Sequence, residues 1–271
     1  MSDRRPSLKD VAREAGVSYQ TVSRVINDGP RVSATTRQRV QAVIAQLGYH
    51  RNQTARSLVT SRSQSIGVVA DGSPKFGPVS TLAAVEQAAR NAGFTALVST
   101  VSYPDPASVA ATFAEFVQRG VEGIVVIAPR VSLADVTNEI RASLPIVMLA
   151  PGETSHPGIT VFYEDQFEGA RLATRHLIDL GHREVAHLAG SQDWLDGQVR
   201  LRGWQAELRS HSLPAPAVRY SDWSGDSAYA IGYDMIRRGL PSAIFVASDL
   251  MALGFMRALS EHGLRVPEAI S

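Results

Sequence analysis

From position 65 onward the sequence alternates between short, continuous apolar runs and longer amphipathic segments, as in IGVVA (66–70), GIVVIA (123–128) and VAHLAG (185–190). Such a run is typical of a parallel strand buried on both faces. The segments between the runs have helical periodicity, so their alternation predicts βαβ units. Two such series, at 65–162 and 163–271, predict an α/β fold of two lobes with parallel sheets. The strands are expected at 66–70, 96–98, 123–128, 146–150, 159–162, 185–190, 218–220 and 243–247, with helices between them.

Residues 1–48 have another pattern, which predicts three short helices and no strand. Ser7 and Asp10 have the spacing of a capping box that opens the first helix, and Gly16 suits a tight left-handed turn after it. Ser18 is a natural cap for a second helix that buries Val22, Val25 and Ile26. Ser33 caps the third helix, and Gly48 ends it.

The second helix directs polar side chains outward and carries no acid: Tyr19, Gln20, Ser23, Arg24 and Asn27. This helix-turn-helix is suited to a DNA major groove. The alternative is a two-helix hairpin whose polar face only contacts water.

The charge distribution favours DNA binding. Residues 1–62 hold 11 Lys and Arg against 4 Asp and Glu, a net charge of +7, whereas the remainder has a net charge of −6. A basic head on an acidic body is expected of a protein that binds DNA through one end. The chain contains no cysteine, no apolar run that would span a bilayer and no signal peptide, so we expect it in the cytoplasm.

Four segments carry a resemblance: SLKDVAREAGVSYQTVSRVIN (7–27), VSATTRQRV (32–40), LGY (47–49) and NQTARSL (52–58). Together they resemble the headpiece of the lactose-repressor (LacI/GalR) family of bacterial transcription regulators. The resemblance implies a helix-turn-helix headpiece (1–48), a hinge (49–64) and a periplasmic-binding-protein-like effector domain with an N-lobe (65–162) and a C-lobe (163–271). Family members usually continue past the point where this sequence stops, so a C-lobe without its last strand is expected.

Geometry and resemblance agree on Tyr19, Gln20 and Arg24 as base-reading residues. Arginine donates two hydrogen bonds to guanine and glutamine pairs with adenine, each good pair discriminating by ~1–3 kcal/mol. Ser18, Thr21, Asn27 and Ser33 are expected to contact phosphates.

In the family the hinge folds on DNA and inserts a leucine into the minor groove. Asn52, Ala55 and Leu58 match that element, while a plain linker is the alternative. Arg51 stands where many members have proline.

The resemblance also suggests effector contacts. Arg200 matches the arginine of an R-x-x-G segment, and Trp223 lies in a D-W-S segment of sugar-responsive members. Ser248 and Asp249 follow a strand, where ligands bind in open α/β sheets, and Asp71 is a weaker candidate of the same kind. A core aromatic is the alternative for Trp223, and a helix cap for Asp249. Ala150 stands where some sugar-binding members have aspartate.

Function follows from these parts as an expectation. The chain is expected to be a dimeric repressor that binds a pseudo-palindromic operator, dimerises through the first lobe and hinge, and responds to a small saccharide or glycoside. We identify no metal site, cofactor motif or catalytic triad, and no membrane association is expected. A sugar-processing enzyme and a periplasmic-type binding protein are the alternatives.

Overall fold

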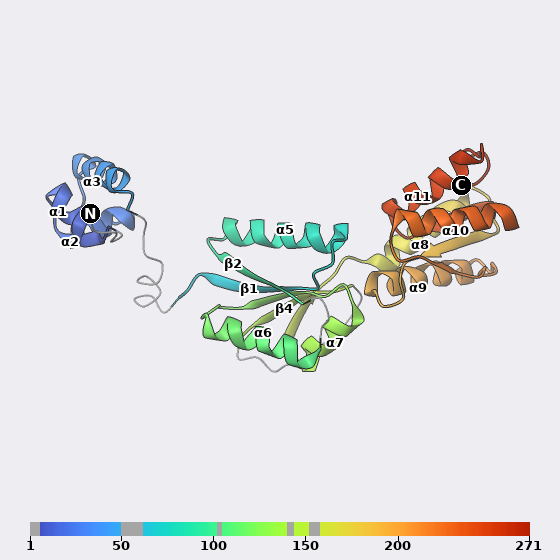
Figure 1. The fold of residues 1–271 in the computed structure, drawn as a ribbon, viewed down its shortest axis with the longest axis horizontal. Coiled ribbons are helices and arrows are strands. Elements are labelled where there is room, and N and C mark those ends of the chain that lie inside the picture. The colour runs from blue at the N-terminus through green and yellow to red at the C-terminus, as the bar shows by residue number, and fades with distance from the viewer. Residues whose placement is uncertain (1–5, 50–61, 102–104, 140–143, 152–157) are drawn as a thin grey trace. The chain divides into compact units, whose positions relative to one another are not determined.

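A computed structural model of the chain describes residues 6–49, 62–101, 105–139, 144–151 and 158–271. The chain divides into two compact units, Met1–Ser63 and Gln64–Ser271. Figure 1 shows the elements of both units in chain order. In the described residues, no helix combines the length and apolar character needed to cross a membrane.

The first unit is a three-helix headpiece of α1 (Leu8–Ala15), α2 (Tyr19–Ile26) and α3 (Ala34–Leu47). The predicted capping box is present, because the Ser7 hydroxyl accepts from the Asp10 amide and the Asp10 carboxylate accepts from the Ser7 amide. Gly16 ends α1 with a φ of 61°, a conformation that costs glycine little. Val11, Val22 and Val40 are fully buried and join the three helices in one small core.

The first lobe of the second unit is a parallel sheet with the strand order β2-β1-β3-β4-β5. Alternate residues of β1 enter different cores: Val68 packs with residues of α5, and Val69 with residues of α6 and α7. The sheet is therefore covered on both faces, by α5 on one and by α6 and α7 on the other (Figure 1). The elements are β1 (Ser65–Ala70), α5 (Phe76–Asn91), β2 (Thr95–Thr100), α6 (Pro106–Gln118), β3 (Ile124–Ile127), α7 (Val131–Glu139), β4 (Ile146–Leu149) and β5 (Ile159–Phe162).

The second lobe is a parallel sheet with the order β7-β6-β8. Buried residues of α8 and α9 pack with Val185 of β6, and those of α10 and α11 pack with Leu188 of the same strand. Ser271 bonds through its amide to Ser242 and through its carbonyl to Ile244, beside β8. The elements are α8 (Gln166–Asp179), β6 (Val185–Ala189), α9 (Leu195–Ser210), β7 (Arg219–Tyr220), α10 (Gly225–Arg238), β8 (Ala243–Val246) and α11 (Asp249–Glu261).

The predicted fold class is confirmed, and the ends of each strand lie within two residues of the expected positions. Because the strands paired within the described residues are parallel, the loops that follow the strands of one sheet emerge at the same edge. Asp71 follows β1 and Arg130 follows β3 in the first lobe, while Trp223 follows β7 and Ser248 follows β8 in the second. This is the edge at which open α/β sheets bind ligands.

Candidate functional site

The first candidate site is the outward face of α2. Val22 and Val25 point into the headpiece core, and this orientation leaves Tyr19, Gln20 and Arg24 exposed. Tyr19 is 52% exposed although it is aromatic. Such a face offers hydrogen-bond donors, acceptors and one cation to whatever lies against it.

The residues predicted to contact phosphates lie around this face. The Ser18 hydroxyl caps α2 by accepting from the Thr21 amide at 3.1 Å, and Ser33 caps α3 in the same way through the Thr36 amide at 3.2 Å. Ser18, Ser33 and Asn27 are exposed, whereas Thr21 and Ser23 are half-buried. Helix N-termini with free amides are common phosphate-binding positions. The hinge residues Asn52, Ala55 and Leu58 lie outside the described residues.

Sequence reasoning missed Arg37, which holds the end of α2 in place. Its guanidinium donates to the carbonyls of Val25 and Gly29 and to the Asp28 carboxylate, at 3.3, 3.1 and 2.9 Å. A cation beside the last carbonyls of a helix is favourable, and here it also ties α3 to α2. Twelve positions separate Arg37 from Val25, so no local pattern indicates this contact.

The second candidate site lies at the strand ends of the second lobe. Trp223 has a φ of 73°, rare for a residue with a side chain, and is only 8% exposed. Its indole occupies a slot formed by glycines: a Cβ at Gly190 would lie 2.0 Å from the Trp223 ring, and one at Gly197 would lie 3.1 Å away. Trp223 packs as a core aromatic, yet its buried Nε1 has no hydrogen-bond partner among the described residues.

Arg200 lies beside that indole, with its guanidinium carbon 5.8 Å from the ring centre. The guanidinium donates to the Gln166 side chain at 2.8 Å and to the Ala247 carbonyl. Arg200 therefore links α9 to the start of α8 and to the end of β8. Asp196, one turn earlier on α9, was missed by the sequence reasoning; burial raises its pKa, while the charge of Arg200 opposes that rise.

Two further predictions concern Ser248 and Asp249. The cap of α11 is Ser248, whose hydroxyl accepts from the Met251 amide at 3.4 Å. The alternative that Asp249 caps this helix is therefore wrong, because Asp249 is the first helical residue and its side chain is exposed. A serine placed one residue earlier has the extended backbone that a cap requires.

Asp71 is buried and already paired. Its carboxylate accepts from the Ser73 amide at 2.9 Å and from the Arg130 guanidinium at 3.0 Å. Arg130 also reaches Asp193 in the second lobe, at 2.7 Å. Asp71 thus anchors a cation, and the sequence reasoning identified neither Arg130 nor Asp193.

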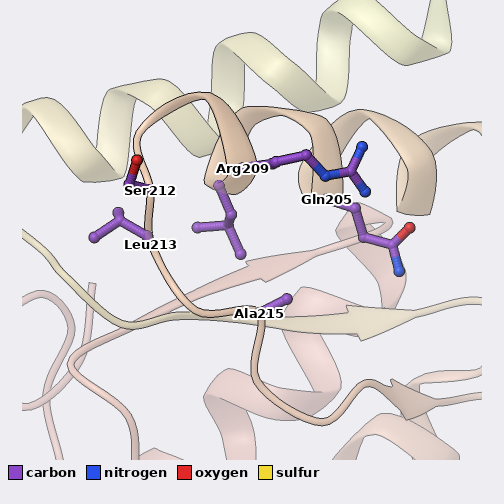
Figure 2. A pocket seen from close by; sticks show the side chains of 6 residues that line it. Gln205, Arg209, Ser212, Leu213 and Ala215 are labelled. Atoms are coloured by element: carbon purple, nitrogen blue, oxygen red, sulfur yellow. The ribbon is translucent and has the colours of Figure 1, made fainter.

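Other features of the described residues do not overlap with these sites. No group of three or more His, Asp and Glu side chains there could hold a metal ion. A hollow beside the end of α9 (Figure 2) contains none of the predicted effector residues; it is lined by Gln205, Leu208, Arg209, Ser212, Leu213 and Ala215.

Both units of the chain match families of known proteins. Residues 7–52 match the family model of bacterial regulatory proteins of the lacI family, and residues 174–271 match that of the periplasmic binding protein-like domain. The lactose operon repressor of Escherichia coli (strain K12) is 35% identical over 98% of this chain and 74% of that protein. The HTH-type transcriptional repressor PurR of Klebsiella pneumoniae (strain 342) is 33% identical over 98% of this chain and 79% of that protein.

Solved structures give the same result. A lac repressor dimer bound to operator and the anti-inducer ONPF is similar with a TM-score of 0.85 and 34% identity, covering 99% of this chain and 81% of that one. A complex of the transcriptional regulator CelR with cellobiose is similar with a TM-score of 0.65 and 30% identity, covering 98% and 81%. With a helix-turn-helix headpiece joined to a two-lobe periplasmic-binding-protein-like domain, the chain belongs to the LacI family of DNA-binding bacterial transcription regulators.

Proposed function

We propose that this regulator is a repressor that binds a pseudo-palindromic operator as a dimer and releases or tightens its hold when a small saccharide or glycoside binds between the lobes. The observation that carries the proposal is the acid-free polar face of α2, which the headpiece core holds outward. Its target is chromosomal DNA, so we place the protein in the cytoplasm.

The DNA contacts are proposed as follows. Tyr19, Gln20 and Arg24 read base edges, because they lie on the exposed face at or near the start of a recognition helix. Ser18, Thr21, Ser23, Asn27 and Ser33 hold phosphates and set the register of that helix on the duplex. Asn52, Ala55 and Leu58 supply the minor-groove element.

Arg24→Ala is expected to reduce discrimination between operator variants by ~1–3 kcal/mol and to leave binding to random duplex nearly unchanged. Mobility shifts with operator variants and with random duplex measure the two kinds of binding. They are run at two salt concentrations, because counterion release makes affinity fall as salt rises. Arg13→Ala is the control, since Arg13 lies on α1 and pairs with Asp10 at 2.8 Å. If specific and random binding fall together for Arg24→Ala, this side chain contacts phosphate and the proposed role is wrong.

A dimer is proposed because two headpieces are needed to contact two half-sites. Apolar side chains available for such an interface are exposed on both lobes: Phe76 and Val79 on α5, and Leu250, Leu253 and Met256 on α11. The last three are spaced along one side of their helix, and an exposed apolar stripe of this kind marks an interface. Sedimentation at micromolar concentration is expected to give twice the mass of one chain, and a single-chain mass would contradict this part.

The effector class rests on Trp223 and Arg200, with Ser248, Asp249 and Asp71 as further contacts. An indole face with a neighbouring guanidinium suits the C–H face and hydroxyls of a sugar. A thermal-shift series of mono- and disaccharides tests this, since a ligand at 100 times its Kd stabilises the native state by about 2.7 kcal/mol. If no sugar raises the melting temperature, the saccharide class is wrong and the DNA-binding proposal stands.

A further inference from the structure

Arg130 joins the two lobes of the second unit. It precedes α7 of the first lobe and donates to Asp71 of the same lobe at 3.0 Å and to Asp193 of the second lobe at 2.7 Å. The Asp71 side chain is 1% exposed and that of Asp193 is 52% exposed. The guanidinium is therefore held by the buried Asp71 carboxylate within the first lobe, and it also pairs with the more exposed Asp193 carboxylate of the second lobe.

Backbone hydrogen bonds between the two lobes hold Arg130 and Asp193 next to each other. The Leu195 amide donates to the Pro129 carbonyl at 2.9 Å, and the Val131 amide donates to the Asp193 carbonyl at 3.2 Å. These bonds form an isolated antiparallel bridge between Arg130 and Trp194. The loop after β3 and the loop after β6 are thus paired like a short piece of sheet.

Trp194 completes the contact. Trp194 is 4% exposed, and two cations of the first lobe lie over its ring: the Arg130 guanidinium is 5.2 Å and the Lys75 ammonium 5.8 Å from the ring centre. Lys75 also donates to the Asp222 carbonyl of the second lobe at 2.8 Å. A cation over an indole face is attracted by its quadrupole, and more so where water is excluded.

The same ring contacts the proposed effector site. The ring centres of Trp194 and Trp223 are 5.8 Å apart, and Arg200 lies on Trp223. A ligand that displaces the Trp223 ring therefore also acts on Trp194, the residue whose ring contacts Arg130 and Lys75. Packed side chains with two discrete arrangements are the physical means by which one site biases another.

We propose that Arg130, Asp193 and Trp194 form a latch between the lobes that favours the arrangement seen here, and that effector binding at Trp223 acts on this latch. This inference adds the regulation of the effector site to the proposed function. Arg130 and Asp193 act as positioning residues, since their partners are protein groups and their effect is on the equilibrium between lobe arrangements.

Asp193→Asn is the decisive variant. It removes the charge that crosses the lobes and leaves the Arg130–Asp71 pair intact, whereas a change at Arg130 would leave the Asp71 carboxylate buried without its cation. Glu115→Gln is the control, because it breaks an exposed pair with Arg119, at 2.8 Å, inside the first lobe.

The measurement is the distance between the lobes in the full chain without effector. The sequence has no cysteine, so Gln118→Cys on α6 and Arg202→Cys on α9, both exposed, create the only two labelling sites for pulsed dipolar spectroscopy. With Asp193→Asn we expect the population at a second distance between the lobes to increase up to about fivefold. This is the change in an equilibrium constant that the loss of a partly exposed ion pair produces. High salt is expected to shift the parent protein in the same direction, because it screens exposed charges.

Three outcomes overturn the latch: identical distances for Asp193→Asn and the parent, an equal shift with Glu115→Gln, or no effect of salt on the parent. Operator binding by the same proteins separates this test from the proposed function. Unchanged distances with normal operator binding reject the latch alone, whereas absent operator binding rejects the proposed function and leaves the distance result interpretable.

Discussion

Glu207→Ala is expected to destabilise the second lobe by about 3 kcal/mol, the lower end of the cost of breaking a buried ion pair. The Glu207 side chain is 0% exposed and accepts from Arg175 at 2.6 Å and from Arg171 at 2.9 Å. These two guanidinium groups hold the pKa of Glu207 below its usual value despite its burial. Without the carboxylate, α9 loses its ion pairs with Arg171 and Arg175 of α8, and a cavity remains between the two helices.

The lower end of the range applies because both arginines stay partly exposed and regain water when their partner is lost. Hydrogen exchange of the α8 and α9 amides is the appropriate measurement, since a chain of several units does not unfold in one two-state step. Glu115→Ala removes an exposed pair and is expected to cost at most about 1 kcal/mol. Replacing Glu207, Arg171 and Arg175 together by methionine should restore most of the loss; if it does not, the charge cluster has a role beyond mutual compensation.

His187 is expected to make the second lobe lose stability as the pH falls from 6.5 to 4. Burial lowers the pKa of His187 to about 4, although its hydrogen bond to the Phe245 carbonyl, at 2.8 Å, favours the protonated form. His187 is 1% exposed, and its ring stacks on Phe245. Below pH 6.5 the unfolded chain protonates this histidine while the folded lobe keeps it neutral.

The unfolded state therefore binds more protons in this window, and the free energy of unfolding falls as the pH drops. The loss reaches roughly 3 kcal/mol near pH 4, and the full contribution is present above pH 6.5. Hydrogen exchange of β6 amides from pH 4.5 to 7.5 measures it, with His187→Phe as the variant and the exposed His176→Gln as the control. Equal pH slopes for the parent and His187→Phe would show that this ring titrates normally in the folded protein.

The headpiece was predictable from sequence almost completely, because its signals are local. The Ser7 capping box, the Gly16 turn and the Ser18 and Ser33 caps each involve residues within a few positions, and all of them are present. Strands β1, β3 and β6 were predictable for a related reason, since a short continuous apolar run is typical of a buried parallel strand. Ser248 and Asp249 mark the limit of this reasoning: either could cap α11 by composition, and only the backbone conformation decides between them.

The sequence by itself determined a basic three-helix head, two α/β lobes and the faces on which polar side chains must lie. Only the tertiary structure decided which of those side chains meet: Arg130 with Asp71 and Asp193, Glu207 with two arginines of another helix, and Trp223 in a slot between glycines. The physical reason is that helix caps and strand periodicity depend on residues only a few positions apart in the sequence. The partners of Arg130 lie 59 and 63 positions away, and the strand order of two sheets brings them together.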